Sequence, residues 1–243
     1  MPEKLIDALR ERVVVADGAM GTMLYAKGIY VNRCYDELNL SQADTVREIH
    51  REYLQAGAEL LETNTFGANP CKLEPHGLAE RTEEICRRGA ELARDIAGDR
   101  AWVGGSVGPL GKPLSPIGKI DEEEAVGFFR PQIRGLVAGG VDLIILETLS
   151  DLVEIRAAFR AVRAECALPV MVLATFAAEG RTLLGYTPEE VLAAMQALPV
   201  EVCGANCSEG PHDMLATVTR LRAAAGEGGM PLAAMPNAGH PRF

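Results

Sequence analysis

The stretch Gly139-Gly140-Val141-Asp142-Leu143-Ile144-Ile145-Leu146-Glu147-Thr148 decides the fold, because a helix stop, a short apolar run and a terminal carboxylate follow one another in it. Four large aliphatic residues stand at consecutive positions, 143–146, which is typical of a parallel strand covered on both faces. The stretch Ala56-Gly57-Ala58-Glu59-Leu60-Leu61-Glu62-Thr63 has the same order of helix stop, strand and Glu-Thr. This weak repeat indicates βα units that end each strand with a carboxylate.

Short apolar runs of this kind alternate with segments of helical period along the whole chain. They lie at residues 13–16, 60–63, 101–105, 141–146, 170–175, 200–205 and 232–235. The alternation predicts an α/β fold, and the polar residues after the runs favour a (β/α)8 barrel of the TIM type over a doubly wound sheet. Seven strands do not close such a barrel. We therefore expect one domain over residues 1–243, truncated after the seventh strand, with the eighth βα unit beyond Phe243.

Residues 41–55 illustrate the helices expected between the strands. Ser41 can cap the first turn, and Val46 and Ile49 belong to a buried apolar stripe at helical spacing. Ala56-Gly57 ends the segment.

Composition and charge exclude several classes of protein. The 243 residues carry a formal net charge of −10, which argues against a nucleic-acid or anionic-membrane partner. No apolar run reaches the 18 or so residues that span a bilayer, and the polar start is not a signal peptide, so we expect a cytoplasmic protein. Six cysteines without a C-x-x-C pair indicate reduced thiols, so any special cysteine is a ligand or a nucleophile.

In a barrel of this type, the chemistry lies where the strands end. Asp17 follows the first run and is either a turn residue or a functional carboxylate. Glu147 continues a run of aliphatics, where burial is costly unless a cation or hydrogen-bond donors meet it, and a substrate ammonium would serve. Cys207 is either a small buried hydrophobe or a thiolate at the barrel mouth, whereas Cys203 fits the core.

Other groups give weaker signals. The four histidines share no metal-ligand spacing, and His50 lies on a helix facing solvent or a neighbour. An aldolase-type barrel would need a strand-end lysine for a Schiff base, and Lys112 and Lys119 lie in a loop instead.

Taken together, six strand-end motifs resemble the homocysteine S-methyltransferase family in order and spacing. They are Asp17-Gly18-Ala19-Met20-Gly21-Thr22, Glu62-Thr63-Asn64-Thr65-Phe66, Gly108-Pro109, Glu147-Thr148, Gly204-Ala205-Asn206-Cys207 and Pro236-Asn237-Ala238-Gly239. The chain is most similar to the N-terminal homocysteine-binding module of cobalamin-dependent methionine synthases. The stretch Arg33-Cys34-Tyr35-Asp36-Glu37-Leu38-Asn39 also resembles bifunctional proteins that join this module to a methylenetetrahydrofolate reductase.

The resemblance implies a zinc ion held by three cysteine thiolates, of which Cys207 matches the first. The other two belong to a Gly-Gly-Cys-Cys motif at strand eight, which this sequence does not reach. By the same resemblance, Asp17 and Glu147 hold the substrate ammonium, and backbone N–H groups around Gly18 meet its carboxylate. The homocysteine thiolate then attacks a methyl group and gives methionine, with Cys207 as both metal ligand and catalytic residue.

The resemblance leaves the methyl donor open among methylcobalamin, a methylated folate such as methyltetrahydrofolate, and a sulfonium or betaine compound. Partners would be homocysteine itself and further cobalamin, folate or reductase domains of the same polypeptide. The alternative hypothesis is a non-catalytic homocysteine-binding module, because only one of the three metal ligands lies in this sequence.

Overall fold

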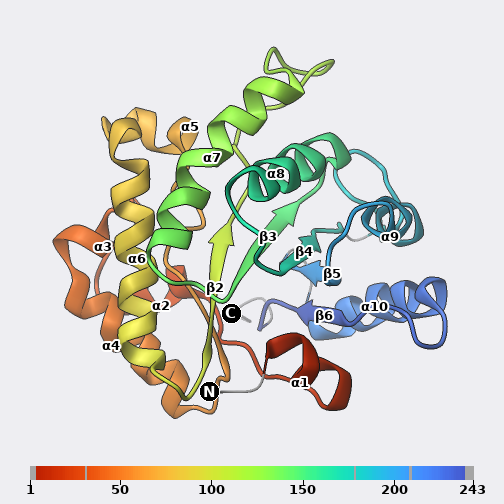
Figure 1. Ribbon diagram of the computed structural model, residues 1–243, viewed down its shortest axis with the longest axis horizontal. Coiled ribbons are helices and arrows are strands. Elements are labelled where there is room, and N and C mark those ends of the chain that lie inside the picture. Colours follow the sequence, from red (N-terminus) through yellow and green to blue (C-terminus); the bar gives the residue numbers. More distant parts are fainter. Residues whose placement is uncertain (1–3, 31, 178, 208–209, 239–243) are drawn as a thin grey trace, which may run out of the picture.

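The computed structural model describes residues 4–30, 32–177, 179–207 and 210–238 and shows an α/β fold built on one curled parallel sheet (Figure 1). Each strand pairs in parallel with the next one along the chain, so the strand order is β1-β2-β3-β4-β5-β6. The strands are β1 (Leu60–Glu62), β2 (Trp102–Val107), β3 (Leu143–Leu149), β4 (Val170–Ala174), β5 (Val202–Asn206) and β6 (Leu232–Met235).

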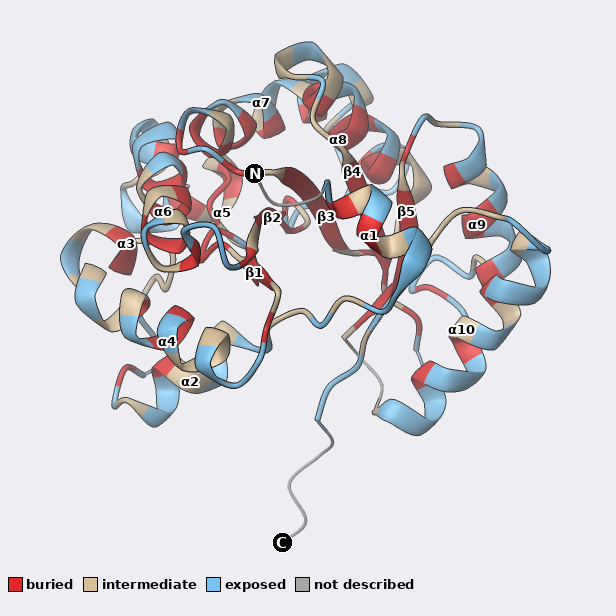
Figure 2. Ribbon diagram, turned by 60° about the horizontal axis from the view of Figure 1, so that its bottom comes forward, coloured by how far each residue is buried: buried red, intermediate tan, exposed pale blue. Residues whose placement is uncertain are grey.

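Helices connect the strands, and most of the helices cover the convex face of the sheet (Figures 1 and 2). They are α1 (Leu5–Glu11), α2 (Met20–Ala26), α3 (Leu38–Ser41), α4 (Ala43–Gln55), α5 (Pro70–Leu73), α6 (Thr82–Ala97), α7 (Glu122–Ala138), α8 (Leu152–Glu165), α9 (Pro188–Gln196) and α10 (Pro211–Ala225), with 3-10 turns η1 (Glu74–His76) and η2 (Ala79–Arg81).

The aliphatic run of β3 explains why this strand lies at the middle of the molecule. Ile144 and Leu146 are buried in the layer between the sheet and the outer helices. Leu143 and Ile145 alternate with them and are buried in a second cluster on the inner face of the sheet. A strand with both faces covered needs apolar residues at consecutive positions, as the sequence predicts.

Helix α1 lies inside the curl of the sheet, at the end where the strands begin (Figure 2). Its Leu5 is buried against Leu60, Leu143, Met171 and Val202, each at or near the start of its strand. Helix α1 therefore closes the inner cluster at the end where the strands begin. The opposite end, where the strands finish, stays open for a site.

The expectation of seven strands is wrong by one, because residues 13–16 form no strand. A single parallel bridge joins Ala16 to Leu60, and Val13 is 84% exposed. Val14 and Ala16 pack against the inner cluster, whereas Val13 and Val15 are exposed, so only one face of this segment is covered. Its apolar residues are therefore not enough to form a strand. The other six runs are confirmed as strands with shifted ends, and the described residues show a curled sheet without the closure of a full barrel.

The helix expected at 41–55 is confirmed, but its cap is not Ser41. Gln42 precedes α4 and makes no side-chain cap, while the Ser41 hydroxyl donates to Glu37 Oε2 at 2.8 Å. Ser41 instead ends the short helix α3, which the sequence pattern did not predict.

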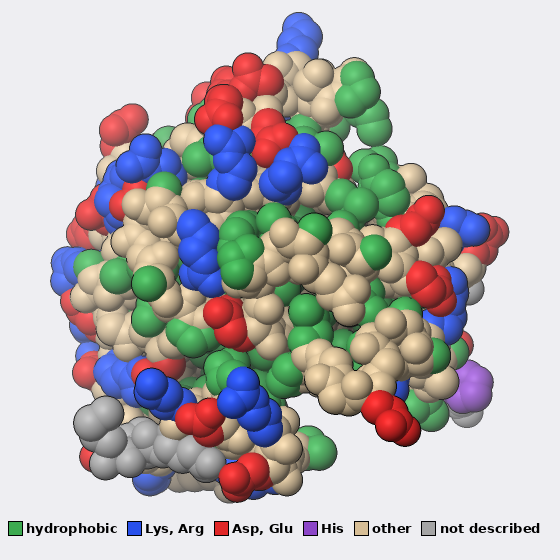
Figure 3. Space-filling model, turned by 45° about the vertical axis from the view of Figure 1, so that its right-hand side comes forward, with side chains coloured by type: hydrophobic (Ala, Val, Ile, Leu, Met, Phe, Trp, Pro, Cys, Tyr) green, Lys and Arg blue, Asp and Glu red, His purple; other side chains and the backbone are tan. Residues whose placement is uncertain are grey.

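Charged side chains form ion pairs over the outer helices, as in Arg156–Glu122 between α8 and α7. The face in Figure 3 shows acidic and basic groups interspersed, and Arg87 pairs with Glu91 along α6. No helix among the described residues is long and apolar enough to cross a membrane.

Candidate active site

Carboxylates gather at the carboxyl end of the sheet, which is common to all parallel strands. Asp17 follows the bridge to β1, Glu62 ends β1, and Glu147 lies in β3. Cys207 follows the last residue of β5. The structure therefore brings together Asp17, Glu147 and Cys207, three residues singled out from the sequence.

Glu147 is a buried carboxylate with two donors. The residue is 8% exposed, and its Oε1 accepts a hydrogen bond from the Ser106 hydroxyl of β2. The other oxygen accepts from Asn206 Nδ2 of β5 at 3.2 Å. Donors from β2 and β5 thus fix its orientation, as expected of a buried carboxylate that needs hydrogen-bond donors.

Asp17 and Glu62 form the other side of the cluster. The Glu62 backbone N–H donates to Asp17 Oδ2 at 3.0 Å, so Asp17 is tied to the end of β1. Asp17 Oδ1 and Glu62 Oε1 are both buried and have no hydrogen-bond partner. Unpaired buried oxygens of this kind are costly, so the cluster has unsatisfied capacity for a cationic donor.

Glu62 is a site residue that the sequence analysis does not single out. The signal was present in the repeat, because Glu62-Thr63 and Glu147-Thr148 occupy the same place after their strands. Since equivalent strand ends of parallel βα units meet at one edge, the repeat could have placed both glutamates in one site.

Burial and mutual repulsion govern the ionisation of the cluster. Burial raises the pKa of Asp17 and of Glu62 well above their usual values, and the charge of Glu147 raises both further. Burial also raises the pKa of Glu147, although the Ser106 hydrogen bond and the charge of Lys72 act in the opposite direction. A bound cation would act against these upward shifts, because it favours the ionised form of each carboxyl group.

Cys207 projects from a backbone in the left-handed region, with φ 57°. Its Sγ lies 3.6 Å from the Thr148 hydroxyl and 3.4 Å from Asn206 Nδ2. Burial raises the pKa of the thiol, and the Thr148 hydrogen bond opposes that effect. Cys203 is fully buried in the helix-facing layer, as expected for a core residue.

Gly18 stands where no side chain fits without displacement. A Cβ at this position would lie 3.0 Å from Tyr53 Oη and 3.1 Å from its ring. The same hydroxyl donates to the Ala19 carbonyl at 3.1 Å and thereby holds the turn after Asp17. The backbone at Gly18 is packed closely against Tyr53 beside the carboxylate cluster.

The two threonines that follow β1 hold the backbone of Ser106, which is next to the site. Thr65 Oγ1 donates to the Ser106 carbonyl at 2.7 Å, and Thr63 Oγ1 accepts from the Ser106 N–H at 3.0 Å. Gln132 of α7 donates to the Thr65 carbonyl at 2.7 Å. This network fixes Ser106, which in turn holds Glu147.

The described residues contain no group of three His, Cys, Asp or Glu side chains arranged to hold a metal ion. Cys207 alone fits one position of a thiolate site, because its sulfur faces two hydrogen-bond donors at the end of β5. His50 does not face solvent, since it is fully buried and neither ring nitrogen has a partner. Gly239 of the last motif lies outside the described residues.

Comparison with known proteins points in one direction. Residues 14–243 match the family model described as homocysteine S-methyltransferase. The chain is 35% identical to a methionine synthase of Mycobacterium tuberculosis and 34% identical to one of Mycobacterium leprae, with 98% of this chain covered in each case. It spans about a fifth of those proteins, 21% of their length.

Solved structures agree with this match. The metallated form of the homocysteine methyltransferase MmuM from Escherichia coli superposes with a TM-score of 0.86 at 25% identity, over 98% of this chain and 88% of that one. Its apo form gives a TM-score of 0.77 at the same identity. The chain belongs to the homocysteine S-methyltransferase family.

Proposed function

We propose that this chain binds homocysteine at the carboxyl end of its sheet and serves its S-methylation to methionine. The observation that carries the proposal is the convergence of the carboxyl groups of Asp17, Glu62 and Glu147, in which two buried oxygens, Asp17 Oδ1 and Glu62 Oε1, have no hydrogen-bond partner. The cluster has neither a positive charge nor enough hydrogen-bond donors, and a substrate ammonium would supply both through its charge and its three N–H groups. The names of the relatives, methionine synthase and homocysteine methyltransferase, support this substrate.

Asp17 and Glu147 hold the ammonium in this proposal, and backbone N–H groups around Gly18 meet the substrate carboxylate. Both carboxylates are fixed, Asp17 by the Glu62 backbone and Glu147 by Ser106 and Asn206. The amino acid is thereby oriented with its sulfur toward Cys207, at the end of β5. Orientation of the nucleophile and exclusion of water are the main contributions that such a site makes to methyl transfer.

Cys207 is the residue that would hold a zinc ion, and the family resemblance places two more thiolates beyond Phe243. Zinc bound by thiolates lowers the pKa of a coordinated substrate thiol, so that it is a nucleophile at neutral pH. In the transfer itself, the substrate sulfur forms a bond to the methyl carbon as the bond from that carbon to its donor breaks. Methylcobalamin and methyltetrahydrofolate are the donors to test.

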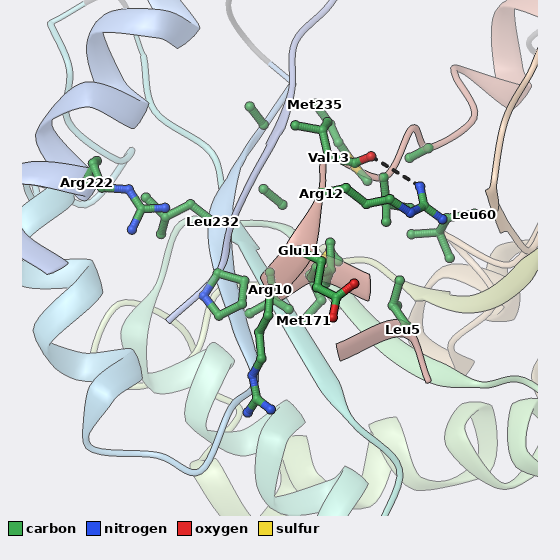
Figure 4. A pocket seen from close by; sticks show the side chains of 17 residues that line it. Leu5, Arg10, Glu11, Arg12, Val13, Leu60, Met171, Arg222, Leu232 and Met235 are labelled. Atoms are coloured by element: carbon green, nitrogen blue, oxygen red, sulfur yellow. Dashed lines mark hydrogen bonds between the residues drawn. The ribbon is translucent and has the colours of Figure 1, made fainter. Parts of the chain in front are cut away.

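We also infer that one further parallel strand completes the barrel. A cavity of about 520 Å³ lies between residues 9–16 and β6, and its lining is mostly apolar (Figure 4). Ala16 bridges to β1 on one side, and β6 pairs with β5 on the other. With residues 13–16 in the place of one strand, a strand in this gap would complete the eight positions of a closed (β/α)8 domain and place its own carboxyl end beside Cys207.

Titration of the chain with L-homocysteine, followed by isothermal calorimetry, tests the binding site. Glu147→Gln should weaken binding by about tenfold or more, since one ionised partner of the ammonium is lost. Glu165→Gln, at the carboxyl end of α8 and paired with Arg130 of α7, is the control and should bind as the wild type does. Unchanged binding by Glu147→Gln would refute the proposal.

The alternative proposal is a homocysteine-binding module without catalysis, favoured by the single thiolate at the site. Mass-spectrometric detection of methionine separates the two, with homocysteine, zinc and each methyl donor supplied to the 243-residue chain. Methionine formation that depends on Cys207 supports the enzyme, whereas binding without turnover by this chain supports the module.

A further inference from the structure

Glu62 is a half-buried residue whose carboxyl group has no part in the binding of the ammonium by Asp17 and Glu147. It ends β1 and its side chain is directed into the same cluster as Asp17 and Glu147, with Oε1 buried and unpartnered. The groups whose charges act on it are Glu147, Asp17 and Cys207, all negative or neutral. No cation among the described residues offsets them.

The three carboxyl groups differ sharply in their hydrogen-bond donors. Glu147 accepts from Ser106 and Asn206, and the charge of Lys72 also favours its ionised form. Asp17 accepts from the Glu62 backbone N–H at 3.0 Å. No described residue donates a hydrogen bond to the Glu62 carboxyl group. Because donors stabilise the charged form of a carboxylate, Glu147 and Asp17 are equipped to ionise and Glu62 is not.

Charge balance leads to the same assignment. One substrate ammonium brings a single positive charge to three adjacent carboxyl groups in a buried site. If all three were ionised, two negative charges would remain uncompensated there, which is strongly unfavourable. At least one group keeps its proton in the complex, and Glu62 is the one without donors.

We propose that Glu62 is a positioning residue that stays protonated, and that its neutral carboxyl group accepts one N–H of the substrate ammonium through Oε1. Asp17 and Glu147 then supply the charge, while Glu62 supplies the third acceptor that a primary ammonium requires. The site would thus prefer a primary amine to an amine with fewer N–H groups. This inference rests on the proposed function for its ligand, but the neutral state of Glu62 belongs to the free protein as well.

Glu62→Gln tests the inference, because glutamine has the shape and the carbonyl acceptor of a protonated glutamate. We expect its Kd for L-homocysteine at pH 7 to stay within about threefold of the wild type, whereas Asp17→Asn and Glu147→Gln weaken binding about tenfold or more. Glu62→Leu removes the acceptor and should weaken binding about tenfold. A loss in Glu62→Gln as large as that in Glu147→Gln, or wild-type binding by Glu62→Leu, would overturn the proposal.

Infrared difference spectroscopy of the free chain gives a readout that needs neither homocysteine nor a folded leucine variant. The wild-type spectrum at pH 7 should contain the carbonyl band of a protonated carboxylic acid that Glu62→Gln lacks. If the two spectra are the same in this region, Glu62 is ionised and the inference is wrong. A protein that shows this band but does not bind homocysteine would instead refute the proposed function alone.

Discussion

At the scale of single residues, the carboxyl groups of the site have raised pKa values because they are removed from solvent and lie close together. Burial raises the pKa of Asp17 and of Glu147, and ammonium binding favours the ionised form of both. Homocysteine binding should therefore release protons to the solvent. Calorimetry in buffers of different ionisation enthalpy measures this release directly.

Proton release should persist in Glu62→Gln and decrease in Glu147→Gln, since the first variant keeps both ionising partners. For the wild type, affinity should rise with pH as the cost of removing these protons falls. A binding enthalpy that is independent of the buffer would contradict this prediction.

His50 gives a prediction about stability. Burial lowers its pKa from 6.5 to about 4, so the unfolded chain binds more protons than the folded one between these values. The contribution of His50 to stability should therefore fall as pH decreases from 6.5 through 4, by about 2 kcal/mol at pH 5, whereas the raised pKa values of the site's acids act in the opposite direction. In urea unfolding, His50→Leu should therefore gain about 2 kcal/mol relative to the wild type when the pH changes from 7 to 5. The exposed His76→Gln is the control and should follow the wild type.

Single positions were predictable from sequence to different degrees. Glu147 could be found because an acid after four aliphatics must be buried, and burial of an acid demands donors. Glu62 is also an acid at the end of an apolar run, but this run is shorter. Its place in the site is indicated by the repeat of Glu-Thr after the two strands. His50 could not be placed, because its burial depends on how α4 packs and not on its neighbours in the sequence.

At the scale of elements, α6 and α7 approach closely at glycines. A Cβ at Gly135 would lie 2.4 Å from the Glu83 carbonyl oxygen and 2.7 Å from Cys86 Cβ. Gly135→Ala should force the helices apart and lower the free energy of unfolding by roughly 1–3 kcal/mol. Chemical denaturation measures the change.

Gly127, also in α7, is the matched control, because a Cβ there would meet nothing within 4 Å. Gly127→Ala should raise stability by about 0.5–1 kcal/mol through helix propensity. Equal effects of the two substitutions would mean that close packing does not account for Gly135.

Elements were predicted well where both faces of a strand are covered, as in β3. The exception, residues 13–16, has an apolar sequence but its side chains remain partly exposed and only one bridge forms. Strand formation there depends on neighbours on both sides, which a local pattern does not report. Short helices such as α3 have too few residues for a helical period to be visible.

At the scale of the whole molecule, the gap beside β6 should govern local opening. If one more strand fills this gap, a chain extended beyond Phe243 should protect the amides of β6 and of residues 13–16 in hydrogen exchange. The amides of β3, in the middle of the sheet, are the internal control and should change little. Equal exchange of β6 in both chains would refute the proposed closure.

The α/β class and the position of the site could be predicted from the sequence, because alternating runs and strand-end carboxylates are local signals. The curvature of the sheet and the placement of α1 inside it could not, since they follow from packing between distant segments. Leu5 meets Met171 and Val202 across more than half of the chain.

Two residues of the site have a left-handed backbone conformation, and this affects which substitutions would stabilise the protein. Thr148 has φ 59° and Cys207 has φ 57°, in a region that favours glycine, yet their side chains meet at 3.6 Å. Side chains other than glycine in this region are strained by about 1–2 kcal/mol each. A laboratory selection for heat resistance alone would therefore enrich glycine at these two positions. The most thermostable variants should be those that have lost the Cys207 thiol, so selection for stability and selection for activity would favour different residues at this edge of the sheet.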